Sequence, residues 1–187
     1  MIFVTGATGL LGSHVLVELL KRGKTVRALK RKTSNLKPVQ SVFKHFFGEN
    51  ADAEFNKIEW VEGDILDIQS LEEGIEGCSI VYHCAALVSF RKRDFKKLMK
   101  INKEGTANVV NVSLNHNVSQ FCHVSSTAAI GRSVSKEVYD ESNKWVNSAE
   151  NSNYAISKFS AENEVWRGKE EGLNAAVSYT HLTLPTT

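Results

Sequence analysis

The chain has 187 residues, enough for one domain with a core that folds unaided. Hydrophobic residues make up 42% and charged residues 24%, close to the averages of globular proteins, which excludes the disordered and fibrous classes. The 23 basic and 21 acidic residues give a net charge of +2, which offers no reason to expect nucleic acid or an anionic membrane as a partner.

Short β-rich runs alternate along the chain with longer segments of helical period. We expect strands at residues 2–5, 25–29, 58–61, 80–83, 120–125 and 173–177. We expect helices between the first two strands, ended by Gly23, and at residues 68–75, 95–114 and 154–171. This alternation predicts an α/β fold, a Rossmann-type doubly wound parallel sheet.

Two connections are irregular. Residues 33–56 are long for a connection between strands and carry four phenylalanines, so we expect a helix packed on the edge of the sheet. Residues 131–153 are polar and are expected to form a surface loop at the carboxyl ends of the strands, where open α/β sheets bind ligands.

The last residues differ in composition from the rest of the chain. Residues 177–187 have no charged side chain, include four threonines, and resemble the translation of a transposon-end adaptor used in DNA sequencing libraries. We therefore expect a native domain over residues 1–176, incomplete at its C-terminus, and a non-native tail over residues 177–187. A genuine threonine-rich terminus is the alternative.

Cysteine use and hydropathy indicate the compartment. The three cysteines are an odd number without a C-x-x-C pair, which favours reduced thiols over a disulfide framework or a zinc site. No apolar run approaches the roughly 18 residues of a membrane helix. Because Met1 leads directly into a predicted strand, we expect no signal peptide. Together with the cysteine pattern, this predicts a cytoplasmic protein that binds no metal.

A glycine-rich turn with the spacing G-x-x-G-x-x-G joins the first strand to the first helix. Glycines there permit a tight turn and a close approach of backbone to a pyrophosphate, and the free amides at the helix start face its charge. The alternative, a plain strand-to-helix turn, is disfavoured by the position of the turn in an N-terminal βαβ unit. The expected cofactor contacts here are Gly6, Thr8, Gly9, Leu10, Leu11 and Gly12.

The end of the second strand predicts which dinucleotide binds. An acidic residue there would bind the ribose 2′-hydroxyl, whereas this chain has Lys30 and Arg31 and no carboxylate. The planar fork of arginine suits a phosphate and lysine adds a point charge, so we expect NADP(H) to be preferred, with NAD(H) as the other cofactor. A solvated basic turn is the alternative interpretation.

Two further segments are expected to contact the cofactor. Asp64, followed by Ile65, could accept a hydrogen bond from the adenine amino group, and an aspartate that caps a helix is the alternative. Ala85 and Ala86 would let the backbone lie close to a ribose. The nearby His83 is interpreted as a packed strand-end residue and not as a catalytic base.

Three side chains form the candidate catalytic group. Tyr154 and Lys158 are spaced i and i+4, on one face of a helix, so that the cation would lower the phenol pKa and make a general acid/base. Ser126 ends the fifth strand and could hydrogen-bond the substrate oxygen, with Thr127 as the reserve candidate. Each element alone is common, but their combination with the glycine-rich turn is not.

These residues together resemble an extended short-chain dehydrogenase/reductase of the NAD-dependent epimerase/dehydratase superfamily. The chain is most similar to the dihydroflavonol-reductase-like and 3β-hydroxysteroid-dehydrogenase-like branches. The motifs that carry the resemblance are residues 5–12, 63–65, 83–86 and 125–126, Asn102 with Gly105 and Thr106, and Tyr154 with Lys158.

The resemblance implies that Ser126 and Tyr154 are catalytic and that Lys158 also binds the nicotinamide ribose. It implies hydride transfer between NAD(P) and a small carbonyl or alcohol substrate, with Asn102 mainly structural. A nucleotide-sugar epimerase or dehydratase with retained NAD, and a non-catalytic dinucleotide sensor, are the alternatives. Relatives continue into a substrate-binding lobe that this chain lacks, so we expect an inactive fragment of a parent protein that forms a homodimer.

Overall fold

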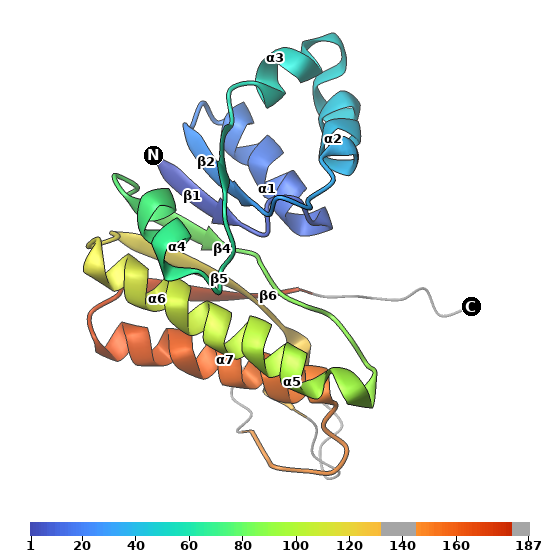
Figure 1. The fold of residues 1–187 in the computed structure, drawn as a ribbon, viewed down its shortest axis with the longest axis vertical. Helices are drawn as coiled ribbons and strands as arrows, with labels where there is room; N and C mark the ends of the chain where they lie inside the picture. The colour runs from blue at the N-terminus through green and yellow to red at the C-terminus, as the bar shows by residue number, and fades with distance from the viewer. Residues whose placement is uncertain (132–144, 181–187) are drawn as a thin grey trace.

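The computed structural model describes residues 1–131 and 145–180. Its centre is a six-stranded parallel sheet with the strand order β3-β2-β1-β4-β5-β6 (Figure 1). The strands are β1 (Ile2–Thr5), β2 (Val26–Lys30), β3 (Glu59–Glu62), β4 (Ile80–His83), β5 (Gln120–Ser126) and β6 (Ala175–Thr180). The order reverses between β1 and β4, as in a doubly wound Rossmann sheet, so the predicted fold class is confirmed.

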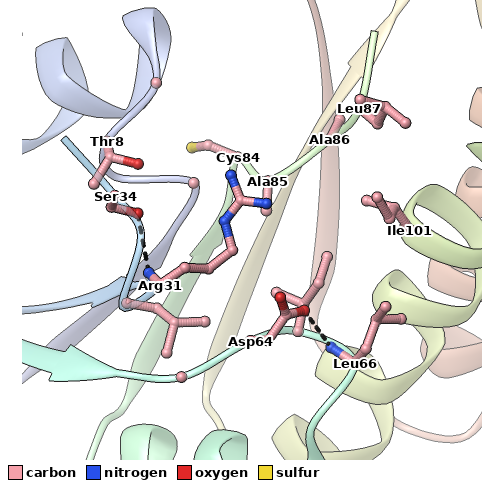
Figure 2. A pocket seen from close by; sticks show the side chains of 15 residues that line it. Thr8, Arg31, Ser34, Asp64, Leu66, Cys84, Ala85, Ala86, Leu87 and Ile101 are labelled. Atoms are coloured by element: carbon pink, nitrogen blue, oxygen red, sulfur yellow. Dashed lines mark hydrogen bonds between the residues drawn. The ribbon is translucent and has the colours of Figure 1, made fainter. Parts of the chain in front are cut away.

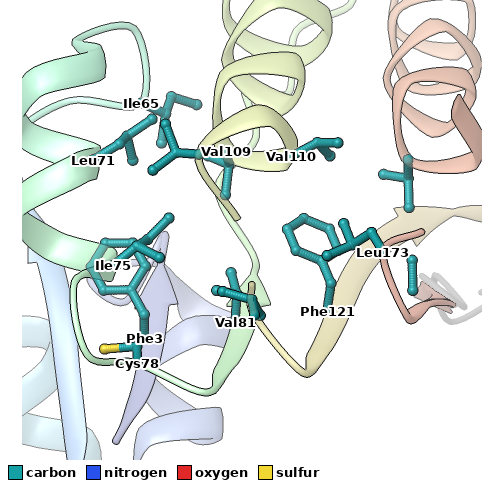
Figure 3. Close-up of a cluster of buried hydrophobic side chains, with 14 of the residues drawn as sticks. Phe3, Ile65, Leu71, Ile75, Cys78, Val81, Val109, Val110, Phe121 and Leu173 are labelled. Atoms are coloured by element: carbon teal, nitrogen blue, oxygen red, sulfur yellow. The ribbon is translucent and has the colours of Figure 1, made fainter. Parts of the chain in front are cut away.

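Helices cover both faces of this sheet (Figure 1). One face carries α1 (Leu10–Lys21), α2 (Lys37–Phe47) and α3 (Ala51–Phe55), and the other carries α4 (Ile68–Ile75), α6 (Gly105–Asn115) and α7 (Asn153–Glu170). Each layer buries its own apolar cluster against the sheet, and Figure 3 shows the one beneath α4 and α6, where Phe3, Val81 and Phe121 pack from neighbouring strands. The two clusters hold the carboxyl ends of the strands in fixed positions.

Most expected elements are present with small shifts in their bounds. The strands at 2–5 and 80–83 and the helix at 68–75 have the predicted limits, while the second and third strands each begin and end one residue later. The connection 33–56 contains α2, a 3-10 turn η1 (Gly48–Asn50) and α3, which confirms the predicted helix. Three of its phenylalanines, Phe43, Phe47 and Phe55, form an aromatic cluster that extends to Trp60 of β3.

The long helix predicted at 95–114 is interrupted. It consists of α5 (Phe95–Leu98), a π-helical stretch η3 (Met99–Glu104) and α6, and a short 3-10 turn η2 (Lys92–Asp94) precedes it. Such π-helical insertions are rare and occur frequently at functional sites. Here the insertion contains Asn102, whose side chain bonds to another segment of the chain.

Two expectations concern the C-terminal third of the chain. Residues 132–144 of the predicted surface loop lie outside the described residues, and residues 145–152 contain no helix or strand. The strand β6 begins two residues later than expected and extends four residues past Ala176, pairing with β5 along its whole length. Among the described helices, none has the length and apolar character needed to cross a membrane.

Candidate functional site: a dinucleotide cavity and a Ser-Tyr-Lys group

A cavity of about 270 Å³ lies at the carboxyl ends of the first four strands (Figure 2). It is formed by the glycine-rich turn and by the segments that follow β2, β3 and β4. Its lining consists of Gly6, Thr8, Gly9, Leu29, Arg31, Ser34, Gly63, Asp64, Ile65, Leu66, Cys84, Ala85, Ala86, Leu87 and Ile101. It therefore lies where the strand order reverses, which is the ligand-binding position of open α/β sheets.

Two glycines of the turn, Gly6 and Gly12, are required by its geometry. Gly6 has φ +66°, and a Cβ there would lie 2.5 Å from the backbone nitrogen of Ala85. A Cβ on Gly12 would lie 2.2 Å from the carbonyl oxygen of Gly6. Gly9 donates its amide to that same oxygen at 3.0 Å and is the N-cap of α1. The turn can be this tight, and the cavity this close to backbone, only without side chains at Gly6 and Gly12.

The six expected contacts of the turn divide into two groups. Gly6, Thr8 and Gly9 line the cavity, whereas Gly12 packs against the turn and does not. The side chains of Leu10 and Leu11 are both exposed, and neither is part of the cavity lining. Among the residues that the structure describes, no side chain caps the N-terminus of α1, so its first amides are available to an anionic group.

The two basic residues at the end of β2 have different surroundings. Arg31 lines the cavity, and its side chain extends across it toward Ala85 (Figure 2). Lys30 lies outside the lining and pairs with Glu62 of β3, with 3.5 Å between Nζ and Oε2. Of these two basic residues, Arg31 is the one among the described cavity-lining residues. Ser34 also lines the cavity, although the sequence did not indicate it, and its hydroxyl accepts the amide of Arg31 at 3.0 Å.

Asp64 enters the cavity from the segment after β3. Its Oδ1 accepts the amide of Leu66 at 3.0 Å (Figure 2). Its own amide donates to the hydroxyl of Ser70. The capping of α4, considered as an alternative role for this aspartate, belongs to Asp67, whose carboxylate accepts the amide of Gln69. Asp64 is thus a carboxylate held at the cavity wall.

The segment after β4 forms the opposite wall. Ala85 and Ala86 line the cavity, and the amide of Ala85 donates to the hydroxyl of Thr5 at 3.3 Å. His83 just before them is fully buried, with Nδ1 at 2.7 Å from Thr5 Oγ1 and Nε2 at 2.9 Å from Thr106 Oγ1. Burial and the nearby Lys158 lower the pKa of His83 to about 3, so this histidine is neutral and structural, as predicted.

The observed cavity fits an adenine dinucleotide. A turn from which Cβ atoms are excluded and a helix start without a side-chain cap suit a pyrophosphate. One arginine at the far end and one carboxylate on the wall provide polar groups for the ribose and adenine ends. In the described part of the chain, no cluster of three or more His, Cys, Asp or Glu side chains is arranged to hold a metal ion.

The candidate catalytic side chains lie outside the cavity lining, at the end of β5 and the start of α7. Ser126 ends β5, and its hydroxyl accepts the amide of Ala128 at the start of the 3-10 turn η4 (Thr127–Ile130). Tyr154 lies in the first turn of α7, near enough for the Ser126 hydroxyl to lower the pKa of its phenol. The structure therefore brings this serine and this tyrosine close together.

The pKa of Tyr154 is raised, whereas the sequence predicts that it is lowered. Burial raises it, and the hydrogen bond with Ser126 opposes this effect without reversing it. The expected lowering by Lys158 is absent because the Lys158 ammonium is directed at the sheet. Its Nζ donates to the carbonyl of Val124 at 2.9 Å and lies 3.3 Å from Nε2 of His123.

Lys158 itself is a buried cation. Its residue is 2% exposed, and burial lowers its pKa to about 8, against a partial compensation by the carboxylate of Glu162. Glu162, one turn further along α7, also accepts the hydroxyl of Ser125 at 2.8 Å. Neither Glu162 nor His123 was predicted from the sequence as a site residue, although the alternation of β5 places His123 and Ser125 on one face.

Asn102 connects the two halves of the site. Its Oδ1 accepts the amide of Leu87 at 2.7 Å, while its Nδ2 donates to the Leu87 carbonyl and to the Ser157 hydroxyl, both at 2.9 Å. Ser157 in turn donates to the carbonyl of Tyr154 at 2.8 Å. The structural role predicted for Asn102 is thus observed, and it links the cavity wall at Leu87 to the turn of α7 that holds the tyrosine.

Comparison with known proteins places these features in one family. The family model described as the NAD dependent epimerase/dehydratase family matches residues 2–183. A putative dihydroflavonol 4-reductase from Synechocystis is 30% identical over 175 residues, which are 94% of this chain and 47% of that protein. A decarboxylating sterol-4-alpha-carboxylate 3-dehydrogenase from Dictyostelium discoideum is 33% identical over 132 residues, which are 69% of this chain and 36% of that protein.

A solved structure agrees with the fold. A short-chain dehydrogenase/reductase superfamily protein from Agrobacterium tumefaciens, determined with bound NAD, superimposes with a TM-score of 0.74 at 26% identity. The match covers 95% of this chain and 48% of that one, so the chain spans about half the length of the relatives it matches or less. From its fold, its glycine-rich cavity and the family match over nearly its whole length, the chain belongs to the NAD-dependent epimerase/dehydratase family.

Proposed function

We propose that this chain carries the cofactor site and the acid/base group of an NAD(P)-dependent oxidoreductase acting on the carbonyl or alcohol of a small molecule. The observation that carries the proposal is the closeness of Ser126, at the end of β5, to Tyr154 of α7, because β5 lies next to β4, the strand that ends at the dinucleotide cavity. A nicotinamide cofactor would supply or accept the hydride. The side chains of this chain would bind and orient the reactants and move the proton.

Tyr154 is suited to be the proton donor in the reduction direction. Because burial raises its pKa, the phenol is protonated at neutral pH and can give its proton to an oxygen that gains negative charge. The Ser126 hydroxyl, held by the amide of Ala128, would hydrogen-bond the same oxygen and stabilise that charge. In the oxidation direction the tyrosine must first lose its proton, so we expect that direction to need higher pH.

We propose that NADP(H) is the preferred cofactor. Arg31 has a guanidinium that can bind a phosphate with two parallel hydrogen bonds, and the nearby Ser34 hydroxyl adds a polar group. No carboxylate follows β2 to bind a ribose 2′-hydroxyl. NAD(H) remains the alternative, because Lys30 is paired with Glu62 and a similar structure was determined with NAD.

Aromatic side chains beside the tyrosine favour an apolar substrate. Phe90 is 75% exposed and packs edge-to-face on the ring of Tyr154, with 5.8 Å between the centroids. Val88, two residues earlier, is also exposed. We therefore favour an apolar alcohol or ketone, as the names of the reductase and sterol dehydrogenase relatives suggest, over a nucleotide sugar.

Turnover by the protein with NADPH tests this assignment. A panel of apolar ketones and aldehydes is compared with nucleotide sugars, and oxidation of NADPH is followed by absorbance. We expect Tyr154→Phe to lower the turnover of an accepted ketone about 100-fold or more while NADPH affinity stays within about twofold. Full activity of Tyr154→Phe, or turnover of nucleotide sugars without net NADPH consumption, would contradict the proposal.

A further inference from the structure

A row of polar side chains crosses the sheet close to the Ser126–Tyr154 pair. The strand register places Thr5, His83 and His123 at matching positions of β1, β4 and β5. The two imidazoles are fully buried and stack with ring centroids 5.3 Å apart. Lys158 from α7 ends the row at His123.

The two histidines differ in how their nitrogens are satisfied. His83 has a threonine hydroxyl at each nitrogen. His123 has Lys158 at Nε2, and its buried Nδ1 has no hydrogen-bond partner within residues 1–131 and 145–180. Leaving a buried polar atom unpaired costs stability, so this imidazole is a poorer core residue than an apolar side chain of similar size. The polar contact that it does make is with the ammonium of Lys158.

That contact limits the directions open to the ammonium. A lysine ammonium has three N–H donors. The carbonyl of Val124 and Nε2 of His123, from consecutive residues of β5, occupy two of them. Lys158 also interacts electrostatically with Cys84, which lines the dinucleotide cavity, so the ammonium lies near the cavity end of β4.

We propose that His123 is a positioning residue that fixes the Lys158 ammonium against β5 and leaves one of its N–H groups for the cofactor. That the third N–H group of Lys158 binds the cofactor rests on the proposed function, whereas the hydrogen bond between Lys158 and His123 does not. The ammonium donates to Nε2, so the single proton of the neutral imidazole is on Nδ1. Burial and the adjacent Lys158 keep the pKa of His123 well below its usual range, which preserves Nε2 as an acceptor.

Two amide substitutions separate the acceptor from the rest of the side chain. In His123→Gln the amide oxygen can occupy the place of Nε2, and in His123→Asn the shorter amide reaches only the place of Nδ1. Both variants are polar and smaller than histidine, so a general effect of polarity or lost volume is common to them. His123→Leu is the apolar variant to use if the asparagine variant does not fold.

The first readout is the pKa of Lys158, measured by NMR on protein with 13C-labelled lysine side chains, with Lys158→Arg to assign the signal. Loss of an acceptor for a buried ammonium lowers its pKa, so we expect a fall of about one unit in His123→Asn and little change in His123→Gln. The other groups that face this ammonium, His83, Glu162 and Cys84, are the same in all variants. Equal pKa values in the two amide variants would overturn the proposal.

The second readout is NADPH affinity, measured by titration. We expect His123→Asn to bind about tenfold more weakly and His123→Gln to be within about threefold of the original chain. Unchanged affinity in His123→Asn would overturn the link between His123 and the cofactor. If the unsubstituted chain binds neither NADPH nor NADH, the proposed function fails, while the NMR result still decides whether His123 positions Lys158.

Discussion

Replacing Lys158 by methionine should stabilise the protein at neutral pH. The ammonium of Lys158 is buried, and its pKa of about 8 is far below its usual value of 10.5 because burial disfavours the charge. That difference of about 2.5 pKa units corresponds to about 3 kcal/mol of destabilisation of the folded state. Methionine removes this cost, but it also removes the two hydrogen bonds of the ammonium, to Val124 and to His123, worth together about 2 kcal/mol. The expected net gain in the free energy of unfolding at pH 7 is about 1 kcal/mol.

The effect must change with pH, and the sign follows from the two pKa values. Between about pH 8 and 10.5 the unfolded chain keeps the Lys158 proton while the folded chain has lost it. The unfolded state then binds more protons, so the stability of the original protein rises with pH through this window. The cost of the buried charge is fully present below pH 8 and is gone above 10.5. The advantage of the methionine variant should therefore shrink and become a disadvantage of about 1 kcal/mol near pH 10.

Urea denaturation at pH 7 and at pH 9.5 measures both effects. At pH 7 the variant should also unfold about 2–4 °C higher than the original chain. Lys97→Met, at an exposed position of α5, is the control and should change stability by less than about 0.5 kcal/mol at either pH. A methionine variant that is less stable at pH 7, or a difference that does not change with pH, would refute the reasoning.

Two further substitutions test the geometry of the site. Gly6→Ala should lower the free energy of unfolding by about 3 kcal/mol or more and abolish cofactor binding, because its Cβ would overlap the backbone of Ala85. The control Gly23→Ala has the same φ of +66° but open space around the Cβ, so urea denaturation should show a loss of about 1 kcal/mol. Asn102→Leu should cost about 3 kcal/mol, because the amide and carbonyl of Leu87 lose their partner, and calorimetry showing a loss below about 1 kcal/mol would contradict this.

Local patterns in the sequence were sufficient to predict the sheet. Alternating apolar runs separated by helical periods located all six strands, and the limits at 2–5 and 80–83 were predicted without error. The glycine spacing predicted the cavity, because Gly6 and Gly9 have their effect within one turn of the backbone. These features depend on neighbours in the chain, which a single sequence contains.

Features that depend on pairing between distant segments were not predicted. Lys30 stays a predicted cofactor contact, but its pairing with Glu62, which the β2–β3 register places opposite it, was not predicted. The π-helical stretch around Asn102 coincides with that side chain's bonds to Leu87, far away in the sequence. The i and i+4 spacing placed Lys158 on the correct helix face, yet the direction of its ammonium is set by acceptors on β5.

Titration of the chain with NADPH and with NADH tests the central claim most directly. Binding is followed through the tryptophan fluorescence and the fluorescence of the nicotinamide, with Arg31→Ala and the matched control Lys30→Ala. We predict tighter binding of NADPH, a loss of about tenfold or more in Arg31→Ala for NADPH alone, and little change in Lys30→Ala. Equal or tighter binding of NADH, or no effect of Arg31→Ala, would contradict the NADP(H) assignment and favour an enzyme that retains NAD.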